Sequence, residues 1–213
     1  MIIALTNADR HHFSTYFNCM HRIRAEVFYH RLHWEVRNEN GFEYDQFDEL
    51  DPVYLLSIDE KTDRVRGSVR LLKTTSPHML RNIFPQLVAD HYPIESPTIW
   101  ECSRFSIDKG YDKPTAGHMI NYATGELIAG IVEAGLIIGL THVVGVFDAR
   151  MIRIFRYAQY QPEIIGKPTR IGSFMTYGGL FDISEQALCN IKKSVNIHGP
   201  VLSSGQVIKP LAA

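Results

Sequence analysis

The chain has 213 residues, which is enough for one full hydrophobic core and gives no reason to expect a second domain. Hydrophobic residues make up 45% and charged residues 21%, a globular composition that excludes a disordered or fibrous protein. Lys and Arg number 22 against 23 Asp and Glu, so the overall charge offers no general attraction to nucleic acid or to a membrane surface.

The cysteine content and the apolar runs indicate the cellular compartment. Cys19, Cys102 and Cys189 are odd in number and lack metal-ligand spacing, so we expect reduced thiols in a cytosolic protein. The N-terminus has no basic region before a long apolar run, as a signal peptide would. The longest apolar stretch, 127–140, contains Glu133 and is too short to span a membrane. We therefore expect a cytoplasmic protein.

The first half of the chain predicts strands around one long helix. Residues 2–5 form an apolar run, and a helix follows whose apolar stripe is Phe13, Phe17, Met20 and Val27. Two β-rich runs, 53–58 and 65–72, flank a polar turn and predict a hairpin. A proline-punctuated segment with a short helix near 78–84 leads to a further strand at 99–107.

The second half predicts three more helices. The longest, 116–140, contains glycines that allow close packing against the sheet. A buried strand at 142–147 and a helix at 149–158 capped by Asp148 follow. Strands at 163–165 and 173–182, a helix capped by Ser184 and a loose tail from 198 to 213 complete the chain. This order predicts a mixed α/β fold in a single domain, 1–213.

The stretch 22–51 has the composition of a site for a small cation. Arg24 and Phe28 share a helix face, and Trp34 follows where that helix should end. A loop then gathers five acidic residues within nine positions: Glu43, Asp45, Asp48, Glu49 and Asp51. Aromatic faces and carboxylates both attract an ammonium or a sulfonium. An amphipathic helix followed by a solvated acidic loop explains this stretch equally well.

The strand WECSRFSID places charges where a buried strand should be apolar. In an ideal strand Glu101 and Arg104 face opposite sides, so a pocket that uses both requires a bulge or a splay. The alternative is an edge strand with two solvated charges. The histidines have no carboxylate or cysteine companions at ligand spacing, so no metal site is expected.

These residues follow one another in a recognisable order: Arg24, Phe28, Trp34, Glu43, Asp45, Asp48, Arg70, Glu101 and Arg104. In them, and in RAEVF, LHWEV, YDQFD, GSVRLLKTTSPHML, IFP and ECSRFSID, the chain resembles the acyl-homoserine lactone synthases, the bacterial autoinducer synthases of quorum sensing. The resemblance is strong over residues 1–110. Beyond them it depends on the order of the elements and on FDARMIRIFR.

The resemblance implies an N-acyltransferase-like α/β fold, with a mixed, mostly antiparallel sheet flanked by helices and splayed central strands that hold an acylated pantetheine. It implies two substrates, S-adenosylmethionine (SAM) and an acyl thioester, and no cofactor. The α-amine of SAM attacks the thioester to form an amide. The methionyl carboxylate then displaces methylthioadenosine from its own γ-carbon and closes the lactone.

The residues suit these steps. The α-amine has a pKa near ~8 and must lose a proton before it attacks, and Glu101 is the candidate general base. Phe28 and Trp34 suit the sulfonium, with Asp45 and Asp48 ordering the loop or binding the amine and ribose. We expect the first helix, the acidic turn and the Glu101 strand to form one cleft.

Other roles concern charge. Arg24 and Arg104 are candidates for holding the SAM carboxylate bidentately. Arg70 is expected to pair with an acidic residue of the loop and, with Glu43, to order it; charge reversal at both partners should then restore function. Main-chain N–H groups around Phe105 are candidates for stabilising the oxyanion. Cys102 lacks a nearby His and is not expected to be a nucleophile.

The donor side is less specified. Arg150, Arg153 and Arg156 recur every three residues and form a basic ridge for acidic acyl carrier protein or for the phosphates of acyl-coenzyme A, unless they are a solvated helix face. The expected acyl pocket consists of Val144, Val146, Phe147, Met151 and Phe174. Many family members have Thr where this chain has Gly145, which implies that a 3-oxo group would lack its hydroxyl partner.

Other classes remain possible. An acetyl-coenzyme A N-acetyltransferase of the same fold usually carries an R/QxxGxG/A loop, and residues 109–118, KGYDKPTAGH, lack it. A non-catalytic protein that binds a small cation would leave Glu101 unexplained. A methyltransferase would need a glycine loop for adenosine that the sequence lacks. The sequence does not specify acyl chain length, branching, 3-oxo substitution, the carrier or the oligomeric state.

Overall fold

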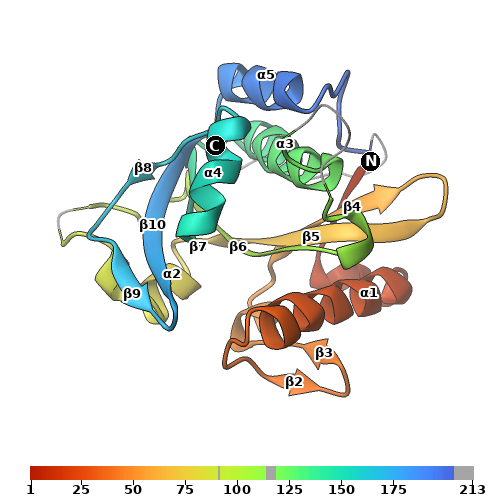
Figure 1. Cartoon of the computed structure of the whole chain (residues 1–213), viewed down its shortest axis with the longest axis horizontal. Coiled ribbons are helices and arrows are strands. Elements are labelled where there is room, and N and C mark those ends of the chain that lie inside the picture. Colours follow the sequence, from red (N-terminus) through yellow and green to blue (C-terminus); the bar gives the residue numbers. More distant parts are fainter. Residues whose placement is uncertain (91, 114–118, 204–213) are drawn as a thin grey trace.

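The protein is built on one large sheet with helices on both faces (Figure 1). The computed structural model describes residues 1–90, 92–113 and 119–203. The strands of the large sheet lie in the order β1-β4-β5-β6-β7-β10-β8, and β9 pairs with β10. The predicted mixed, mostly antiparallel α/β sheet is confirmed, because β6 and β7 are the only parallel neighbours among these described strands.

The N-terminal half of the sheet consists of β1 (Ile2–Leu5), β4 (Val53–Asp59), β5 (Arg64–Lys73) and β6 (Ile99–Ile107). The predicted hairpin is β4 and β5. Side chains alternate between the two faces: Leu55 belongs to the core under α3, whereas Tyr54 and Leu56 pack on the side of α1. Both faces are therefore covered, and most residues of these strands are buried.

The C-terminal half contains β7 (His142–Asp148), β8 (Glu163–Ile164), β9 (Thr169–Ile171) and β10 (Phe174–Asp182). Strands β6 and β7 pair from Ile99 and His142 as far as Cys102 and Gly145. Beyond that pair both strands continue but no longer pair with each other, so the predicted splay between central strands is confirmed. The two halves of the sheet separate at this point.

One face carries α1 (Ser14–Arg24), which continues as a π-helical segment, Ala25–Arg31. Phe17 and Met20 lie on its apolar face and pack against β1 and β4, as the stripe predicted, whereas Phe13 precedes the helix and is exposed. The acidic turn after it is built from short elements: β2 (Asn38–Glu39), β3 (Phe42–Glu43) and a 3-10 turn, Gln46–Glu49.

The opposite face carries α3 (Tyr122–Ile138) and α5 (Glu185–Ser194), which lie together above the sheet in Figure 1. The predicted helix began at 116, and residues 116–118 lie outside the described part of the chain. A Cβ on Gly130 would lie 3.0 Å from Ile2 of β1, so that glycine permits close packing on the sheet. A Cβ on Gly125 would lie 2.4 Å from Val195, so that glycine serves packing against the end of α5 instead.

Two further helices flank the splay. The side chain of Asp148 accepts a hydrogen bond from the Arg150 N–H and caps α4 (Ala149–Tyr157), as predicted. The short helix predicted before β6 is α2 (Met79–Asn82), followed by a 3-10 turn, Pro85–Leu87. Within the described residues no helix has the length and apolarity needed to cross a membrane.

The expectation of a loose tail from residue 198 is wrong for residues 201–203. The Ile2 N–H donates to the Val201 carbonyl at 2.7 Å, and the Ser203 N–H donates to the Ile2 carbonyl at 2.8 Å. Glu133 of α3 accepts hydrogen bonds from the Val201 and Leu202 N–H groups. This segment is fixed by backbone hydrogen bonds, which side-chain patterns do not reveal. Residues 204–213 of that expectation lie outside the described part.

Candidate functional site

A largely buried ionic network holds three carboxylates of the acidic turn, Glu43, Asp45 and Asp48. Arg24 is 1% exposed, and its Nε donates to Glu43 at 2.5 Å. Its two terminal nitrogens donate to both oxygens of Asp48 at 2.8 Å. Burial alone would raise the pKa of Asp48, but the charge and hydrogen bonds of Arg24 hold that pKa well below its usual range. The solvated-loop alternative is therefore wrong for Glu43, Asp45 and Asp48, whereas Glu49 and Asp51 are exposed as it predicts.

The predicted pairing of Arg70 with the acidic turn is confirmed. Its Nη1 donates to Asp45 at 2.5 Å and to Asp48 at 2.8 Å, and its Nε donates to Ser103 at 3.2 Å. The Tyr54 hydroxyl adds a further hydrogen bond to Asp48. Arg70 thus ties the turn to the strands β5 and β6 at the middle of the sheet.

Arg104 occupies the predicted bulge in β6. Ser106 pairs with Ser68 and Ser103 with Arg70, so Arg104 and Phe105 together face the single residue between those partners on β5. Arg104 has φ of +55°, a left-handed conformation that costs a non-glycine residue of order 1–3 kcal/mol. This extra residue breaks the alternation of the strand, and Glu101, Arg104 and Phe105 all line one cavity.

The Arg104 guanidinium is almost fully engaged by the network. Its Nη2 lies 2.7 Å from Asp45 and 3.0 Å from Glu43, while Nη1 lies 3.1 Å from the Met79 sulfur. Its central carbon lies 5.3 Å from the centre of the Phe28 ring. Arg104 therefore joins the acidic turn to the aromatic wall of the cavity.

Glu101 is a buried carboxylate at the start of α2. It is 1% exposed and accepts hydrogen bonds from the Met79 N–H at 3.1 Å and the Leu80 N–H at 2.6 Å. Burial raises the pKa of Glu101, although these hydrogen bonds, the one from Leu80 foremost, oppose the rise. A carboxyl group with a raised pKa at a cavity wall is suited to take up a proton.

Phe28 and Trp34 form an aromatic wall of the cavity that Glu101 also lines. Their ring centres are 5.1 Å apart, with 30° between the ring planes. The main-chain N–H of Trp34 donates to the Phe28 carbonyl, which fixes the turn after the π-helical segment. Trp34 is 38% exposed, so part of its indole is available to a ligand.

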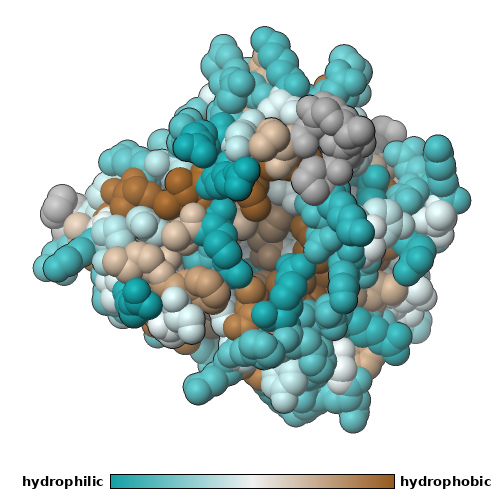
Figure 2. Space-filling view, in the orientation of Figure 1, coloured by the Kyte–Doolittle hydropathy of each residue, from teal (hydrophilic) through white to brown (hydrophobic). Residues whose placement is uncertain are grey.

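These groups share one cavity of about 500 Å³, which enters the splay between β6 and β7. Both Trp34 and Glu101 line it, which confirms the expected single cleft. Figure 2 shows a hollow with apolar side chains in the middle of the displayed face. One end has polar and aromatic walls and the other is apolar, so the cavity suits a charged molecule beside an acyl chain.

Three predicted substrate ligands do not line this cavity. Arg24, Asp45 and Asp48 lie behind Arg104 in the ionic network. The guanidinium of Arg24 is fully occupied by carboxylates, so the expectation that it holds a substrate carboxylate is corrected to a loop-ordering role. The sequence shows that arginines and carboxylates are both present, but it does not show which arginine pairs with which carboxylate.

The apolar end of the cavity differs in part from the predicted acyl pocket. Val146, Phe147 and Met151 line it, but Val144 points to the other face of the sheet and packs against Leu80 and Leu87. Phe174 lies outside it, under the guanidinium of Arg150 at 4.1 Å. The sequence analysis missed several apolar lining residues: Ile128, Ile131, Val143, Ile154, Phe155, Tyr160 and Phe181.

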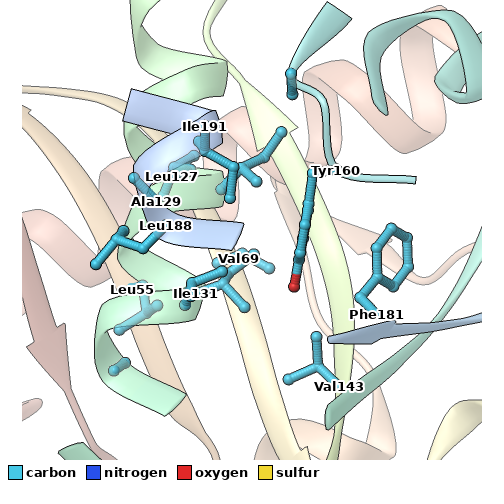
Figure 3. Close-up of a cluster of buried hydrophobic side chains, with 14 of the residues drawn as sticks. Leu55, Val69, Leu127, Ala129, Ile131, Val143, Tyr160, Phe181, Leu188 and Ile191 are labelled. Carbon is cyan, nitrogen blue, oxygen red and sulfur yellow. The ribbon is translucent and has the colours of Figure 1, made fainter. Parts of the chain in front are cut away.

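Figure 3 shows the buried hydrophobic cluster that includes part of this wall, with Val143, Tyr160 and Phe181 opposite Leu127 and Ile131 of α3; of these five, Leu127 does not line the cavity. The rings of Phe155 and Phe181 meet edge to face at 4.8 Å, and the Tyr160 hydroxyl donates to the Asp182 carbonyl. Strand alternation could have identified Val143, because it shares a face with Gly145 and Phe147. No local pattern connects α3 or Tyr160 to that face.

The predicted basic ridge is exposed on α4. Arg150 pairs with Asp148 and also lines the cavity mouth. Arg153 donates to the Tyr157 hydroxyl at 3.2 Å, and the Arg156 guanidinium lies over the same ring. Cys102 faces the cavity, but burial raises the pKa of its thiol to about 12, which opposes a nucleophilic role.

Comparison with known proteins decides the family. The chain matches the family model described as Autoinducer synthase over residues 9–191. It is 37% identical over 180 residues to an acyl-homoserine-lactone synthase of Rhizobium radiobacter, covering 84% of each chain. This chain belongs to the autoinducer synthase family. It is an acyl-homoserine lactone synthase, an acyltransferase that makes a quorum-sensing signal from SAM and an acyl donor.

Solved structures of autoinducer synthases agree with this assignment. The CoA-dependent synthase BjaI, solved with SAM and isopentyl-CoA, is 27% identical with a TM-score of 0.84, covering 95% of this chain and 92% of that one. An N-acetyltransferase from Lactobacillus plantarum is only 16% identical, with a TM-score of 0.53 and coverage of 86% and 99%. That likeness concerns the fold alone, so the synthase is favoured over the N-acetyltransferase.

Proposed function

We propose that this autoinducer synthase carries out both of its steps in the single cavity between the aromatic wall and the splayed strands. The observation that carries the proposal is the presence of Glu101 and Trp34 on one cavity whose other end is apolar. SAM occupies the polar end, with its sulfonium on Phe28 and Trp34. The acyl chain occupies the apolar end, and the thioester lies between the two.

Glu101 acts as the general base of the acylation step, directly or through one water. It takes the proton from the α-amine, and the amine nitrogen then forms a bond to the thioester carbon. The main-chain N–H of Phe105, at the bulge, stabilises the oxyanion, an interaction worth ~3 to 4 kcal/mol where a single donor was removed from another enzyme. The thiolate leaves as the carbon–sulfur bond breaks.

Lactone closure needs no further base. The methionyl carboxylate attacks the γ-carbon of the same molecule, and the bond between that carbon and the sulfonium breaks to release methylthioadenosine. The aromatic wall holds the sulfonium, and Arg104 positions that wall through Phe28. Asp45 and Asp48 act indirectly, because their contacts with Arg70 and Arg104 fix the cavity wall.

The acyl pocket favours a chain without a 3-oxo group. The lining beyond the splay is mostly apolar, and Gly145 contributes no hydroxyl to hydrogen-bond such a group. Arg150, Arg153 and Arg156 dock the acidic part of the donor. For a carrier protein that part is its acidic surface, and for coenzyme A it is the phosphates; BjaI is CoA-dependent.

One experiment tests this proposal. The purified protein is incubated with SAM and a panel of acyl thioesters on both carriers, and lactones and methylthioadenosine are identified by mass spectrometry. We expect one lactone per methylthioadenosine released, and a preference for donors without a 3-oxo group. Binding of SAM with no product from any donor would instead support the non-catalytic alternative.

A further inference from the structure

The proposed reaction leaves the SAM carboxylate without a cation. Three arginines among the described residues line the cavity: Arg31, Arg104 and Arg150. Arg104 is engaged by two carboxylates, those of Glu43 and Asp45, and Arg150 pairs with Asp148 at the start of α4, on the acyl side. Arg31 alone of these three lies on the element that supplies Phe28.

Arg31 is placed beside the aromatic wall. It ends the π-helical segment Ala25–Arg31, three residues after Phe28 and three before Trp34. A cation here lies on the same wall as the site proposed for the sulfonium. The reaction requires the carboxylate to reach the carbon next to that sulfonium, so the two charges of SAM must be held close together.

The ion pair that Arg31 makes is weak. Its Nη1 lies 3.2 Å from Asp112, and the two side chains are 45% and 34% exposed. A single long contact between exposed groups contributes little, about 0–1 kcal/mol. Asp112 also lines the cavity, and its carbonyl accepts a hydrogen bond from Asn121, the capping residue of α3. The pair thus joins the SAM wall to the start of α3.

We propose that Arg31 binds the methionyl carboxylate of SAM, and that Asp112 is a counter-ion which this carboxylate displaces. An arginine with one weak partner retains donors for a bidentate contact with a carboxylate, which is a stronger interaction. This assignment rests on the proposed function, since it needs SAM in the polar end. It replaces Arg24 and Arg104, whose guanidiniums already hold buried carboxylates.

The test measures binding by titration calorimetry with SAM and with decarboxylated SAM, which keeps the sulfonium and the amine. Arg31→Gln should weaken SAM binding about tenfold or more, as expected for a charged hydrogen bond, and leave decarboxylated SAM unchanged. Arg31→Lys should lie between, because a lysine keeps the charge but loses the fork. Asp112→Asn should tighten SAM binding, because it removes the competing anion.

Arg37→Gln is the matched control, because Arg37 pairs with Glu39 and does not line the cavity. It should leave both ligands unaffected. Equal losses of both ligands in Arg31→Gln, unchanged SAM affinity in that variant, or weaker SAM binding in Asp112→Asn would each overturn the assignment. Lactone formation by the unmodified protein reports on the proposed function separately, so failure of one idea is distinguishable from failure of the other.

Discussion

At the scale of single residues, Glu101 determines whether the cavity is catalytic. Glu101→Gln removes the base but keeps an oxygen that can accept from the Leu80 N–H. We expect turnover to fall about 10²- to 10⁴-fold, the usual contribution of a general base, with SAM affinity changed little. Steady-state kinetics and calorimetry on the same preparation separate the two effects.

The pH profile supplies a second measurement for Glu101. A base must be deprotonated to act. Because the pKa of Glu101 is raised, kcat/KM should begin to fall on the acid side at a pH above about 4.3, the ordinary pKa of a glutamate. Glu95→Gln is the control, because Glu95 is exposed and pairs with Arg81. An unchanged turnover in Glu101→Gln would exclude the assigned role.

Arg70 shows where residue-level reasoning fell short. Charge reversal at both partners was expected to restore function, on the assumption of an isolated pair. Arg70 is instead shared between Asp45 and Asp48, and Asp48 also binds Arg24. An aspartate at position 70 would face Asp48, and an arginine at 45 would face Arg104. The double reversal is therefore not expected to restore function.

At the scale of elements, successive residues of strand β7 face opposite sides of the sheet and serve different purposes. Val143 lines the cavity, whereas Val144 packs against Leu80 and Leu87 on the opposite face. Val143→Ala should shift kcat/KM toward longer acyl chains, because it enlarges the apolar end. Val144→Ala should leave that preference unchanged and cost about 1–3 kcal/mol of unfolding free energy. Kinetics with a panel of acyl donors measures the chain-length preference of each variant, and denaturant unfolding measures its stability. A shifted preference in Val144→Ala would contradict the faces assigned to these two residues.

The contact between α3 and α5 provides another prediction. A Cβ on Gly125 would lie 2.4 Å from Val195, so Gly125→Ala should destabilise the protein by about 1–3 kcal/mol despite the better helix propensity of alanine. In a Val195→Ala background the cost should be smaller by about 1 kcal/mol or more. Denaturant unfolding of the four proteins measures this coupling, and purely additive costs would show that Val195 is not the obstacle.

Most elements could be predicted from the sequence because their signals are local. Runs of β-forming residues on either side of a polar turn identified β4 and β5, and side-chain caps identified the starts of α4 and α5. Features that depend on contacts between residues far apart in the sequence could not be found in this way. The docking of Val201 beside Ile2 and the cavity wall formed by Tyr160 are examples, because each requires the assembled sheet.

At the scale of the whole molecule, the buried charges make stability depend on pH. His21 is fully buried, its Nδ1 donates to the Glu43 carbonyl, and its Nε2 has no partner among the described residues. Burial, and then the charge of Arg24, lowers the pKa of His21 to about 4. In the unfolded chain the pKa is about 6.5. The unfolded state therefore binds more protons across this range.

The free energy of unfolding should consequently fall as pH is lowered from about 6.5 to 4, by about 3 kcal/mol from this residue. His21→Gln should remove most of that slope, whereas His30→Gln, on the exposed side of the same helix, should not. Denaturant unfolding at a series of pH values measures the slope. An unaltered slope in His21→Gln would show that another group titrates there.

The left-handed backbone at Arg104 makes a general method of stabilisation unsafe in this enzyme. Stability screens favour Asn or Gly at such a position, because either relaxes the main chain. Here that replacement would leave Glu43 and Asp45 with one cation fewer and would release the Phe28 ring from its cationic neighbour. A design guided by main-chain conformation alone would therefore choose a substitution that removes this cation from the cavity wall.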